Sequence, residues 1–313
     1  MTTLNPAHPV RRRPQRSYSA IPGETPGSPP WRVLKSLVLL VCVVLVLLPF
    51  LAIVSTSLAD TVQVTKAGGY VMWPDHPSFD AYKALLNGGL VSRAMLVSVG
   101  VTVVGTALSL FCSIMLAYGL SRPGSYGHRP VLMLLLMSML FAPGVIPSYL
   151  MIKQLHLINS YWSLILPGLI NGFNVIVLRS FFMSIPKELI DSARIDGASE
   201  WKILTRIVLP LSKASVAVIG LFYAVTYWNA FFNALLYIND AAKWPMQMVL
   251  RTYVINNAQL SGGQVDVAAG APLPPSQSLQ AAILVLSIVP IVVVYPFLQR
   301  HMNKGVMVGA VKG

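Results

Sequence analysis

The sequence predicts an all-α, polytopic membrane protein, and two observations lead to that class. Of its 313 residues, 55% are hydrophobic and only 11% are charged, whereas soluble domains carry about 25% charged residues. Residues 37–54 form an uninterrupted apolar run of 18 residues, about the length that a helix needs to cross a hydrocarbon core of about 30 Å. We therefore expect helices that span a membrane.

A cleaved signal peptide is the alternative interpretation of this first run, because small residues such as Ser55 and Ala59 follow it. However, a segment of 36 residues precedes the run, and the run is longer than the hydrophobic region of about 7–15 residues in a signal peptide. We favour an uncleaved anchor. The two cysteines, Cys42 and Cys112, lie in apolar runs and do not indicate a disulfide framework.

Apolar windows of about 19 residues predict six transmembrane helices. They cover residues 37–57, 94–118, 131–152, 161–182, 214–238 and 279–298. If the N-terminus is cytoplasmic, 17 of the 23 Lys and Arg residues fall in segments on the cytoplasmic side. The positive-inside rule then predicts that both termini are cytoplasmic. The same distribution explains the net charge of +13 without nucleic-acid binding, which a basic protein otherwise suggests.

The predicted domains are a disordered cytoplasmic tail, residues 1–32, and a transmembrane domain, residues 33–313. The tail is rich in Pro, Arg and Ser and has little apolar surface to bury. Two long outer loops are expected, residues 60–93 with a short helix at 79–86, and residues 239–278, which are flexible by composition.

The otherwise hydrophobic chain contains one charged segment, residues 186–211, with the sequence "PKELIDSARIDGASEWKILTRIVLPL". We call it the charged hairpin, because it predicts two short helices around a glycine turn. Pro186 suits the first turn of a helix and Gly197 its end. Ser199 is placed to cap a second helix that Pro210 closes. On the first helix, Ile185, Leu189 and Ala193 form the predicted apolar face.

The hairpin has three possible uses on these grounds. A DNA-binding helix-turn-helix has the same outline, but a short hairpin held against the bilayer between two spans does not reach a major groove. A docking site for a cytoplasmic protein and an interfacial connector between spans remain equally supported by the physical pattern.

The spacing of its residues adds a resemblance. Asp191-Ser192-Ala193, three residues, Gly197, nine residues and then Ile207-Val208-Leu209-Pro210 resembles the EAA loop of permease subunits of binding-protein-dependent ABC importers. Asp191 and Ser192 stand where the family has Glu and Ala. "VTYWNAFFNALLYI" and the C-terminal residues 295–313 are similar to the carbohydrate-uptake, MalG-like branch.

The resemblance implies a type I ABC importer permease fold, with residues 184–213 as the coupling loop that docks on an ATPase. The implied coupling residues are Glu188, Asp191, Ser192, Ala193, Gly197, Ile207, Leu209 and Pro210. The implied partners are two ABC ATPase subunits, a second homologous permease subunit, an extracytoplasmic solute-binding protein, a sugar substrate and membrane lipid, with no nucleic acid. The outer loop 239–278 is a candidate contact with the binding protein, because it lies on the side where that protein should dock.

No enzymatic activity is expected from this chain. It has no G-x-x-x-x-G-K-[ST] phosphate loop, and its five histidines are scattered, so we expect no catalytic residues, metal or cofactor. An ion-coupled secondary transporter or channel is the alternative function, and a membrane scaffold is a third. Ion coupling is disfavoured because the predicted spans contain no carboxylates, which ion-driven carriers use.

Polar and aromatic side chains in the fourth and fifth spans are the candidate substrate path. Amides bond sugar hydroxyls, and aromatic rings pack on sugar C–H faces. Packing between helices is the alternative role, since Asn often bonds across membrane helices. The candidates are Asn171, Asn174, Tyr223, Tyr227, Trp228, Asn229 and Asn233.

Overall fold

The computed structural model describes residues 29–87, 89–122, 124, 126–141, 143–255 and 274–309, with the side chains of 29, 32 and 297–309 left out. Every regular element in these ranges is helical. In chain order they are α1 (Pro29–Leu58), α2 (Thr61–Ala67), α3 (Asp80–Asn87), α4 (Leu90–Ser121), α5 (His128–Leu140), α6 (Val145–Gln154), α7 (Trp162–Ile165), η1 (Leu166–Gly168), α8 (Gly172–Met183), α9 (Lys187–Ile195), α10 (Glu200–Ile203), η2 (Leu204–Val208), α11 (Leu209–Leu211), α12 (Lys213–Trp228), α13 (Phe231–Tyr237), η3 (Ala241–Lys243), α14 (Met246–Leu250), η4 (Arg251–Ile255) and α15 (Ser276–Gly309).

Two predicted flexible regions fall largely outside this description. Of the predicted tail, residues 1–28 lie outside the described residues, and α1 already begins at Pro29. Of the outer loop 239–278, residues 256–273 lie outside as well. The short helix expected at 79–86 is confirmed as α3. The chain divides into two units, Met1–Phe50 and Leu51–Gly313, and the packing described below belongs to the second.

Three described helices are long and apolar enough to cross a membrane: Val33–Leu58, Leu90–Ser121 and Ser276–Pro296. The number rises to five if each of two bent helix pairs counts as one span. These are Trp162–Gly168 with Gly172–Met183, bent by 51°, and Glu200–Leu211 with Lys213–Trp228, bent by 85°.

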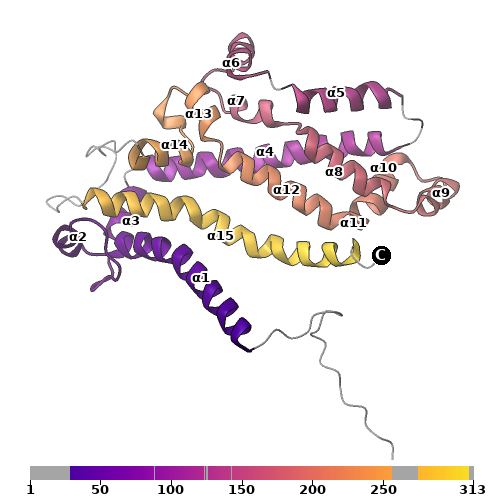
Figure 1. The fold of residues 1–313 in the computed structure, drawn as a ribbon. Coiled ribbons are helices and arrows are strands. Elements are labelled where there is room, and N and C mark those ends of the chain that lie inside the picture. Colours follow the sequence, from indigo (N-terminus) through magenta and orange to yellow (C-terminus); the bar gives the residue numbers. More distant parts are fainter. Residues whose placement is uncertain are drawn as a thin grey trace, which may run out of the picture. The chain divides into compact units, whose positions relative to one another are not determined.

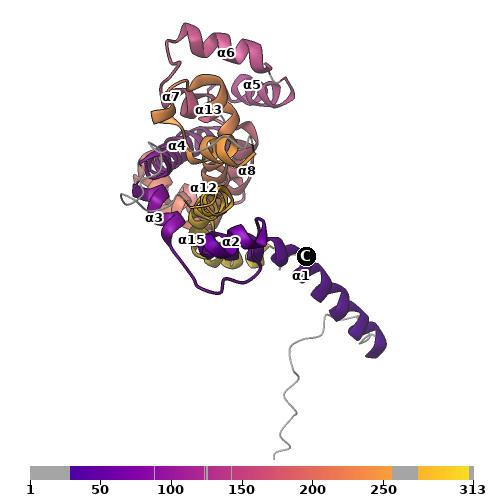
Figure 2. The same cartoon turned by 90° about the vertical axis from the view of Figure 1, so that its left-hand side faces the viewer.

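The predicted span 131–152 differs most from the structure. It consists of two helices, α5 and α6, with a break at residues 141–144. In Figure 1, α5 is seen from the side and α6 nearly end-on. In Figure 2, α6 is seen from the side and α5 nearly end-on. Gly144 has a φ of 80°, a left-handed conformation that glycine accepts, and Pro147 lies in the first turn of α6, where no N–H is needed.

Breaks also divide the predicted spans 161–182 and 214–238. In 161–182, Pro167 is followed by Asn171 in an extended conformation, and the Asn171 side chain accepts a hydrogen bond from the Asn174 amide at 3.2 Å. This bond caps α8 and starts a new helix direction. In 214–238, α12 ends at Trp228 and α13 begins at Phe231. Polar and proline residues thus interrupt helices that apolar composition alone predicts to be continuous.

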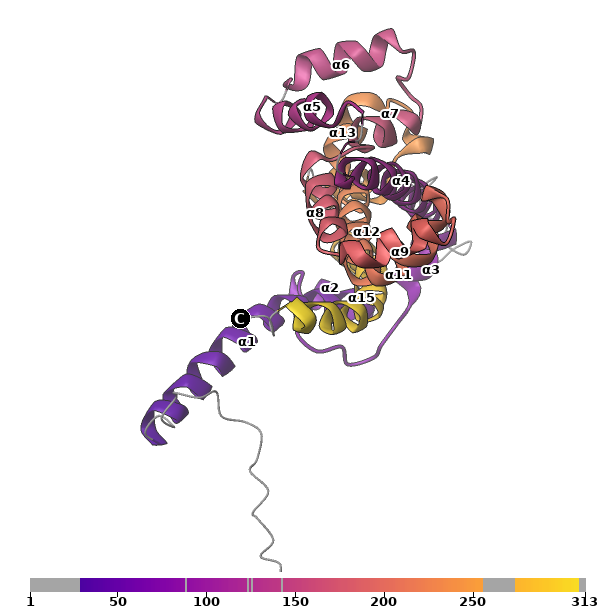
Figure 3. The same ribbon diagram turned by 90° about the vertical axis from the view of Figure 1, so that its right-hand side faces the viewer.

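The main core lies where α4 packs against α8 and α12. These helices run alongside one another in Figure 1 and are seen nearly end-on in Figure 3. Small residues of α4 face α12. The hydroxyl of Ser109 bonds that of Tyr227 at 2.7 Å, and the hydroxyl of Ser113 bonds that of Tyr223 at 2.7 Å.

A second core joins α3, the start of α4, α14 and the start of α15. Leu85, Val91, Met246, Val249 and Ile283 are fully buried in it. The hydroxyl of Ser98 accepts a hydrogen bond from the Met246 amide at 2.7 Å, so the buried start of α14 is satisfied.

Gly105 tests the contact between α4 and α12. A Cβ at this position would lie 2.9 Å from three ring atoms of Tyr227, and the Tyr227 hydroxyl is held by Ser109 and by the Ile165 carbonyl. We expect Gly105→Ala to lower the free energy of unfolding by about 1–3 kcal/mol, the usual cost of overpacking. Thermal unfolding of the purified, detergent-solubilised chain measures it.

Gly100→Ala is the matched control on the same helix, because nothing lies within 4 Å of the added Cβ. Alanine is the better helix former by about 1 kcal/mol, so this variant should melt no lower than the wild type. Equal melting of the two variants would contradict the close packing of Tyr227 on Gly105.

Candidate functional site

The first helix of the charged hairpin begins and ends as the sequence predicts. Pro186 precedes α9, and Gly197 follows it with a φ of 74°. The amide of Gly197 donates to the Arg194 carbonyl at 3.0 Å, and that of Ala198 donates to the Ala193 carbonyl at 2.9 Å. These two bonds form a Schellman motif, which satisfies the last carbonyls of α9 and turns the chain sharply.

The second helix starts at its predicted cap. The Ser199 hydroxyl accepts a hydrogen bond from the Lys202 amide at 3.4 Å. From there α10, the π turn η2 and α11 run on without interruption to Leu211. Pro210, which has no N–H to donate, is the second residue after the π turn. The chain then bends by 85° into α12, so the hairpin leads straight into a helix of the main core.

The apolar face predicted for the first helix is confirmed at Ile185 and Ala193 and wrong at Leu189. Ile190 is buried and Ala193 packs against the main core, whereas Leu189 is exposed. Successive residues are about 100° apart around a helix, so the inward face falls on Ile190 and leaves Leu189 outside. Four large apolar side chains of the hairpin are exposed: Leu189 (46%), Ile195 (87%), Trp201 (58%) and, at its end, Leu211 (60%).

The predicted coupling residues fall into two groups. On the first helix, Glu188, Asp191 and Ser192 are exposed, and Ala193 is half-buried. Asp191 lies 3.8 Å from Arg194 in an exposed ion pair, an interaction of little energy. On the second helix, the coupling residues lie closer to the core: Ile207 and Leu209 are half-buried and Pro210 is exposed.

Glu200 joins the hairpin to the end of α4. Its carboxylate accepts hydrogen bonds from the Tyr118 hydroxyl at 2.5 Å and from Arg194 at 2.8 and 3.1 Å. Arg122 lies 3.7 Å from the same carboxylate and donates to the Tyr118 hydroxyl. The hydrogen bonds from Tyr118 and Arg194 lower the pKa of the Glu200 carboxyl, and Glu200 in turn raises the pKa of Arg194.

The contact of Glu200 with Tyr118 and Arg122 was not predicted from the sequence. Tyr118 is 82 residues away along the chain, and nothing in the local spacing indicates the contact. Arg122 entered the sequence reasoning only as a charge that orients the spans.

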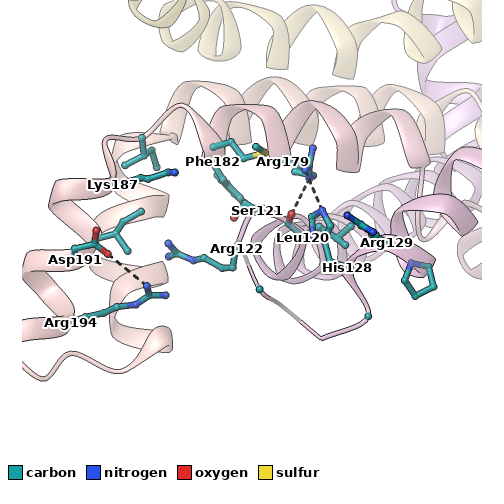
Figure 4. A pocket seen from close by; sticks show the side chains of 16 residues that line it. Leu120, Ser121, Arg122, His128, Arg129, Arg179, Phe182, Lys187, Asp191 and Arg194 are labelled. Atoms are coloured by element: carbon teal, nitrogen blue, oxygen red, sulfur yellow. Dashed lines mark hydrogen bonds and ion pairs between the residues drawn. The ribbon is translucent and has the colours of Figure 1, made fainter.

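A cavity of about 730 Å³ lies beside the hairpin. Its walls come from the end of α4, the start of α5, the end of α8 and α9. Figure 4 shows Arg122, Lys187 and Arg194 on one side of it and Arg179, His128 and Arg129 on the other. Basic side chains therefore dominate its polar lining.

The aromatic residues of the predicted substrate path hold helices together. Tyr223 and Tyr227 are buried and bond the hydroxyls of Ser113 and Ser109 on α4. Trp228 is also buried, and its indole donates to the Ser287 carbonyl on α15 at 3.1 Å. These contacts are of the kind that the packing interpretation predicts.

Of the four asparagines of the predicted path, Asn171 and Asn174 lie together and are joined by a hydrogen bond. Asn171 caps α8, and Asn174 is buried in its first turn. The side-chain amide of Asn229 donates a hydrogen bond to the Val225 carbonyl at 2.9 Å, and Asn233 is half-buried on α13. None of the seven path residues lines the basic cavity.

Comparison with known proteins assigns the chain to a family. Residues 30–308 match the family described as "Binding-protein-dependent transport system inner membrane component". The polygalacturonan/rhamnogalacturonan transport system permease protein YtcP of Bacillus subtilis (strain 168) is 45% identical over 274 residues, which are 88% of this chain and 94% of that protein. Protein LplC of the same organism is 46% identical over 267 residues, or 85% of this chain and 90% of that protein.

Solved structures agree with this assignment. A chain in the crystal structure of a bacterial ABC transporter involved in the import of the acidic polysaccharide alginate aligns with a TM-score of 0.81 at 28% identity, over 90% of this chain and 99% of that one. A bacterial alginate ABC transporter in complex with alginate pentasaccharide-bound periplasmic protein aligns with a TM-score of 0.53 at 17% identity, which shows the fold alone. The chain thus belongs to the inner-membrane permease components of binding-protein-dependent transport systems.

Proposed function

We propose that this chain is a permease subunit of an ATP-driven importer and that it translocates an oligosaccharide or related sugar. An external binding protein delivers the sugar, a second homologous permease completes the pore, and two ATPase subunits supply the energy. The observation that carries the proposal is the charged hairpin, whose family spacing from Asp191 through Gly197 to Pro210 coincides with a rigid turn joined to α4 and α12.

We propose six spans with both termini and the hairpin in the cytoplasm. The distribution of Lys and Arg supports this orientation. Five spans correspond to the long helices and bent pairs, with α12 as the fifth, and α5, an apolar helix of 13 residues, supplies the shorter remaining one. The ion-coupled carrier is the less favoured function, because the family is one of binding-protein-dependent transporters.

The hairpin acts as the coupling element in this proposal. The exposed carboxylates of Glu188 and Asp191 pair with basic groups of the ATPase, and the exposed Leu189, Ile195 and Trp201 fill its groove. Such a mixture of apolar anchors and charges is typical of protein interfaces. Motion of the docked hairpin passes to α4 through Glu200 and to α12 through the bend after Leu211.

The substrate class rests on the relatives. YtcP is named for polygalacturonan and rhamnogalacturonan, and the alginate transporter for an acidic polysaccharide, so fragments of these polymers are the first sugars to test. Asn229 and Asn233 remain the proposed sugar contacts, because the tyrosines and Trp228 already bond other helices. The outer loop 239–278 is the proposed contact with the binding protein.

Replacing Asp191 tests the coupling function. The full complex should hydrolyse ATP faster when sugar-loaded binding protein is added, and Asp191→Lys should reduce sugar uptake at least about tenfold, because a like-charge contact costs more than about 1.4 kcal/mol. Uptake into proteoliposomes and release of phosphate measure the two effects.

Asp191→Glu is the control, since it keeps the carboxylate and should keep uptake near the wild-type rate. Both variants should be present in the membrane in equal amounts, because the ion pair of Asp191 with Arg194 is exposed. Normal uptake by Asp191→Lys, or ATP hydrolysis that ignores the binding protein, would contradict the proposal.

Replacing Glu200 tests the connection between hairpin and spans. Glu200→Gln removes the charge that holds Tyr118, Arg194 and Arg122 together. An exposed charge cluster contributes about 1 kcal/mol, so amide hydrogen exchange of residues 187–203 should become about fivefold faster. Sugar imported per ATP hydrolysed should fall.

Glu188→Gln is the matched control for exchange, because the described structure shows no hydrogen bond or ion pair of the Glu188 side chain. Exchange in the hairpin should stay at the wild-type rate in this variant. If Glu200→Gln behaves like Glu188→Gln, the hairpin is held by apolar packing alone.

Replacing Asn229 and Asn233 by alanine separates sugar contact from packing. Each lost hydrogen bond to a sugar costs about 1 kcal/mol, so the double variant should raise the KM of uptake well over tenfold with binding-protein-stimulated ATP hydrolysis retained. Thr226→Ala, which removes an exposed hydroxyl from α12, should leave the KM unchanged. An unchanged KM in the double variant would assign both asparagines to packing.

A further inference from the structure

The basic cavity beside the hairpin has more positive charge than its protein surroundings balance. Its titratable lining residues are Arg122, His128, Arg129, Arg179, Lys187, Arg194 and a single acid, Asp191. Arg122 and Arg194 have carboxylates within 4.0 Å, from Glu200 and Asp191. In the described part of the chain, Arg129, Arg179 and Lys187 have none. Clustered cations without counter-charges favour a bound anion.

Two buried donors in the cavity lining have no hydrogen-bond partner among the described residues. They are Nε of Arg122 and Nδ1 of His128. Arg179 Nη2 lies 3.5 Å from His128 Nε2. Because a guanidinium only donates, Nε2 is the acceptor in this contact and Nδ1 is the donor of the ring. Nε of Arg122 lies 3.7 Å from the Glu200 carboxylate, so Nδ1 of His128 is the buried donor that lacks an acceptor among the described residues. Buried donors are almost always paired, so this nitrogen indicates an acceptor that comes from outside the chain.

The position of Arg179 is fixed before any ligand arrives. Its Nε donates to the Leu120 carbonyl at the end of α4 at 2.9 Å, and Figure 4 shows the guanidinium close to His128. A planar guanidinium with one edge held and other N–H groups left over is suited to phosphate oxygens. Fixing it in advance lowers the entropy cost of binding.

The remaining lining is apolar and lies at the ends of membrane helices. Leu120, Phe182, Ile185 and Ile190 line the same cavity as the cations. Next to it, α5 exposes Met133, Leu134 and Met137. A free inorganic ion makes no use of such surface, whereas a phospholipid presents a phosphate joined to glycerol and acyl chains. The volume of about 730 Å³ is within the range of about 300–1,000 Å³ of ligand sites.

We propose that this cavity binds the phosphate headgroup of an anionic phospholipid, with the acyl chains along α5. Basic pockets between membrane helices on the cytoplasmic side are a known setting for such headgroups, and the choice of leaflet rests on the orientation proposed above. An acidic segment of the ATPase is the less favoured occupant, because Glu188 and the exposed apolar side chains of the hairpin, which form most of the proposed docking face, do not line this cavity.

The test compares lipids that remain bound to the full complex. The complex is reconstituted in nanodiscs of phosphatidylglycerol and phosphatidylcholine, extracted gently and analysed by native mass spectrometry. Wild type should retain phosphatidylglycerol in preference to phosphatidylcholine. Arg129→Gln with Lys187→Gln should reduce this preference at least about fivefold, the effect of about 1 kcal/mol per charge near a membrane surface.

The described structure shows no hydrogen bond or ion pair of the Arg129 and Lys187 side chains, so the double variant should fold normally. Lys202→Gln with Arg206→Gln is the control: it removes the same charge from exposed positions of the hairpin outside the cavity, and it should keep the preference. A repeat with excess inorganic phosphate separates the headgroup of a lipid from a free ion.

Three outcomes would overturn the proposal. They are equal retention of the two lipids by the wild type, an equal loss in the control variant, and displacement of the lipid by inorganic phosphate that then stays bound. If an ATPase segment crosslinks to residues of the cavity, the occupant is a protein and the lipid proposal is also wrong. Lipid retention is read without transport, so its failure would leave the permease function untouched.

Discussion

The close approach of α12 to α4 is the contact on which the rest of the described bundle depends. Gly105 leaves room for the ring of Tyr227, and Ser109 and Ser113 are short enough for their hydroxyls to reach Tyr227 and Tyr223 at 2.7 Å. Between helices in lipid, burial of apolar surface discriminates little among partners, so small residues and such hydrogen bonds decide which helices pair. The same rings also hold the break between α7 and α8, through the Ile165 carbonyl and the Asn171 amide.

The hairpin extends this arrangement to the charged end of the bundle. Tyr118 lies on α4, beyond Ser113, and brings Glu200 and with it the second helix of the hairpin against α4. Ile203, Leu204 and Val208 are buried in the main core. The hairpin is therefore attached by both apolar packing and charge, while the outer side of α9 stays free for a partner. In the proposed function, the packed second helix transmits motion and the outer side of α9 docks on the ATPase.

Local signals in the sequence predicted local structure well. Gly197 and Ser199 predicted the turn and the cap, because a left-handed residue and a side-chain acceptor act within a few residues of the chain. The spacing from Asp191 to Pro210 indicated the family, which the comparison confirms. The inward face of the first hairpin helix was predicted correctly at Ile185 and Ala193, but Ile190 is buried where Leu189 was expected, since periodicity in a helix of 9 residues leaves its orientation open.

Contacts between segments that are far apart along the chain could not be predicted from the sequence. The cluster of Tyr118, Arg122 and Glu200 depends on how α4 and the hairpin meet, and no spacing encodes that. Composition likewise predicted continuous spans at 131–152 and 214–238, where the structure has breaks. Apolar content measures whether a segment tolerates lipid, but backbone hydrogen bonding decides whether it is one helix. The role of the seven path residues stays a prediction.

The uninterrupted passage from Glu200 to the bend after Leu211 has a mechanical consequence. The second helix of the hairpin starts just after the Schellman turn and is continuous up to Ser212, where the chain bends into α12. In the proposed function, motion of α9 passes to α4 and α12 together, because the Ser109–Tyr227 and Ser113–Tyr223 hydrogen bonds join these two helices. Under that proposal α4 and α12 move as one body, and the subunit bends at the helix breaks farther along, around residues 166–171 and 229–230.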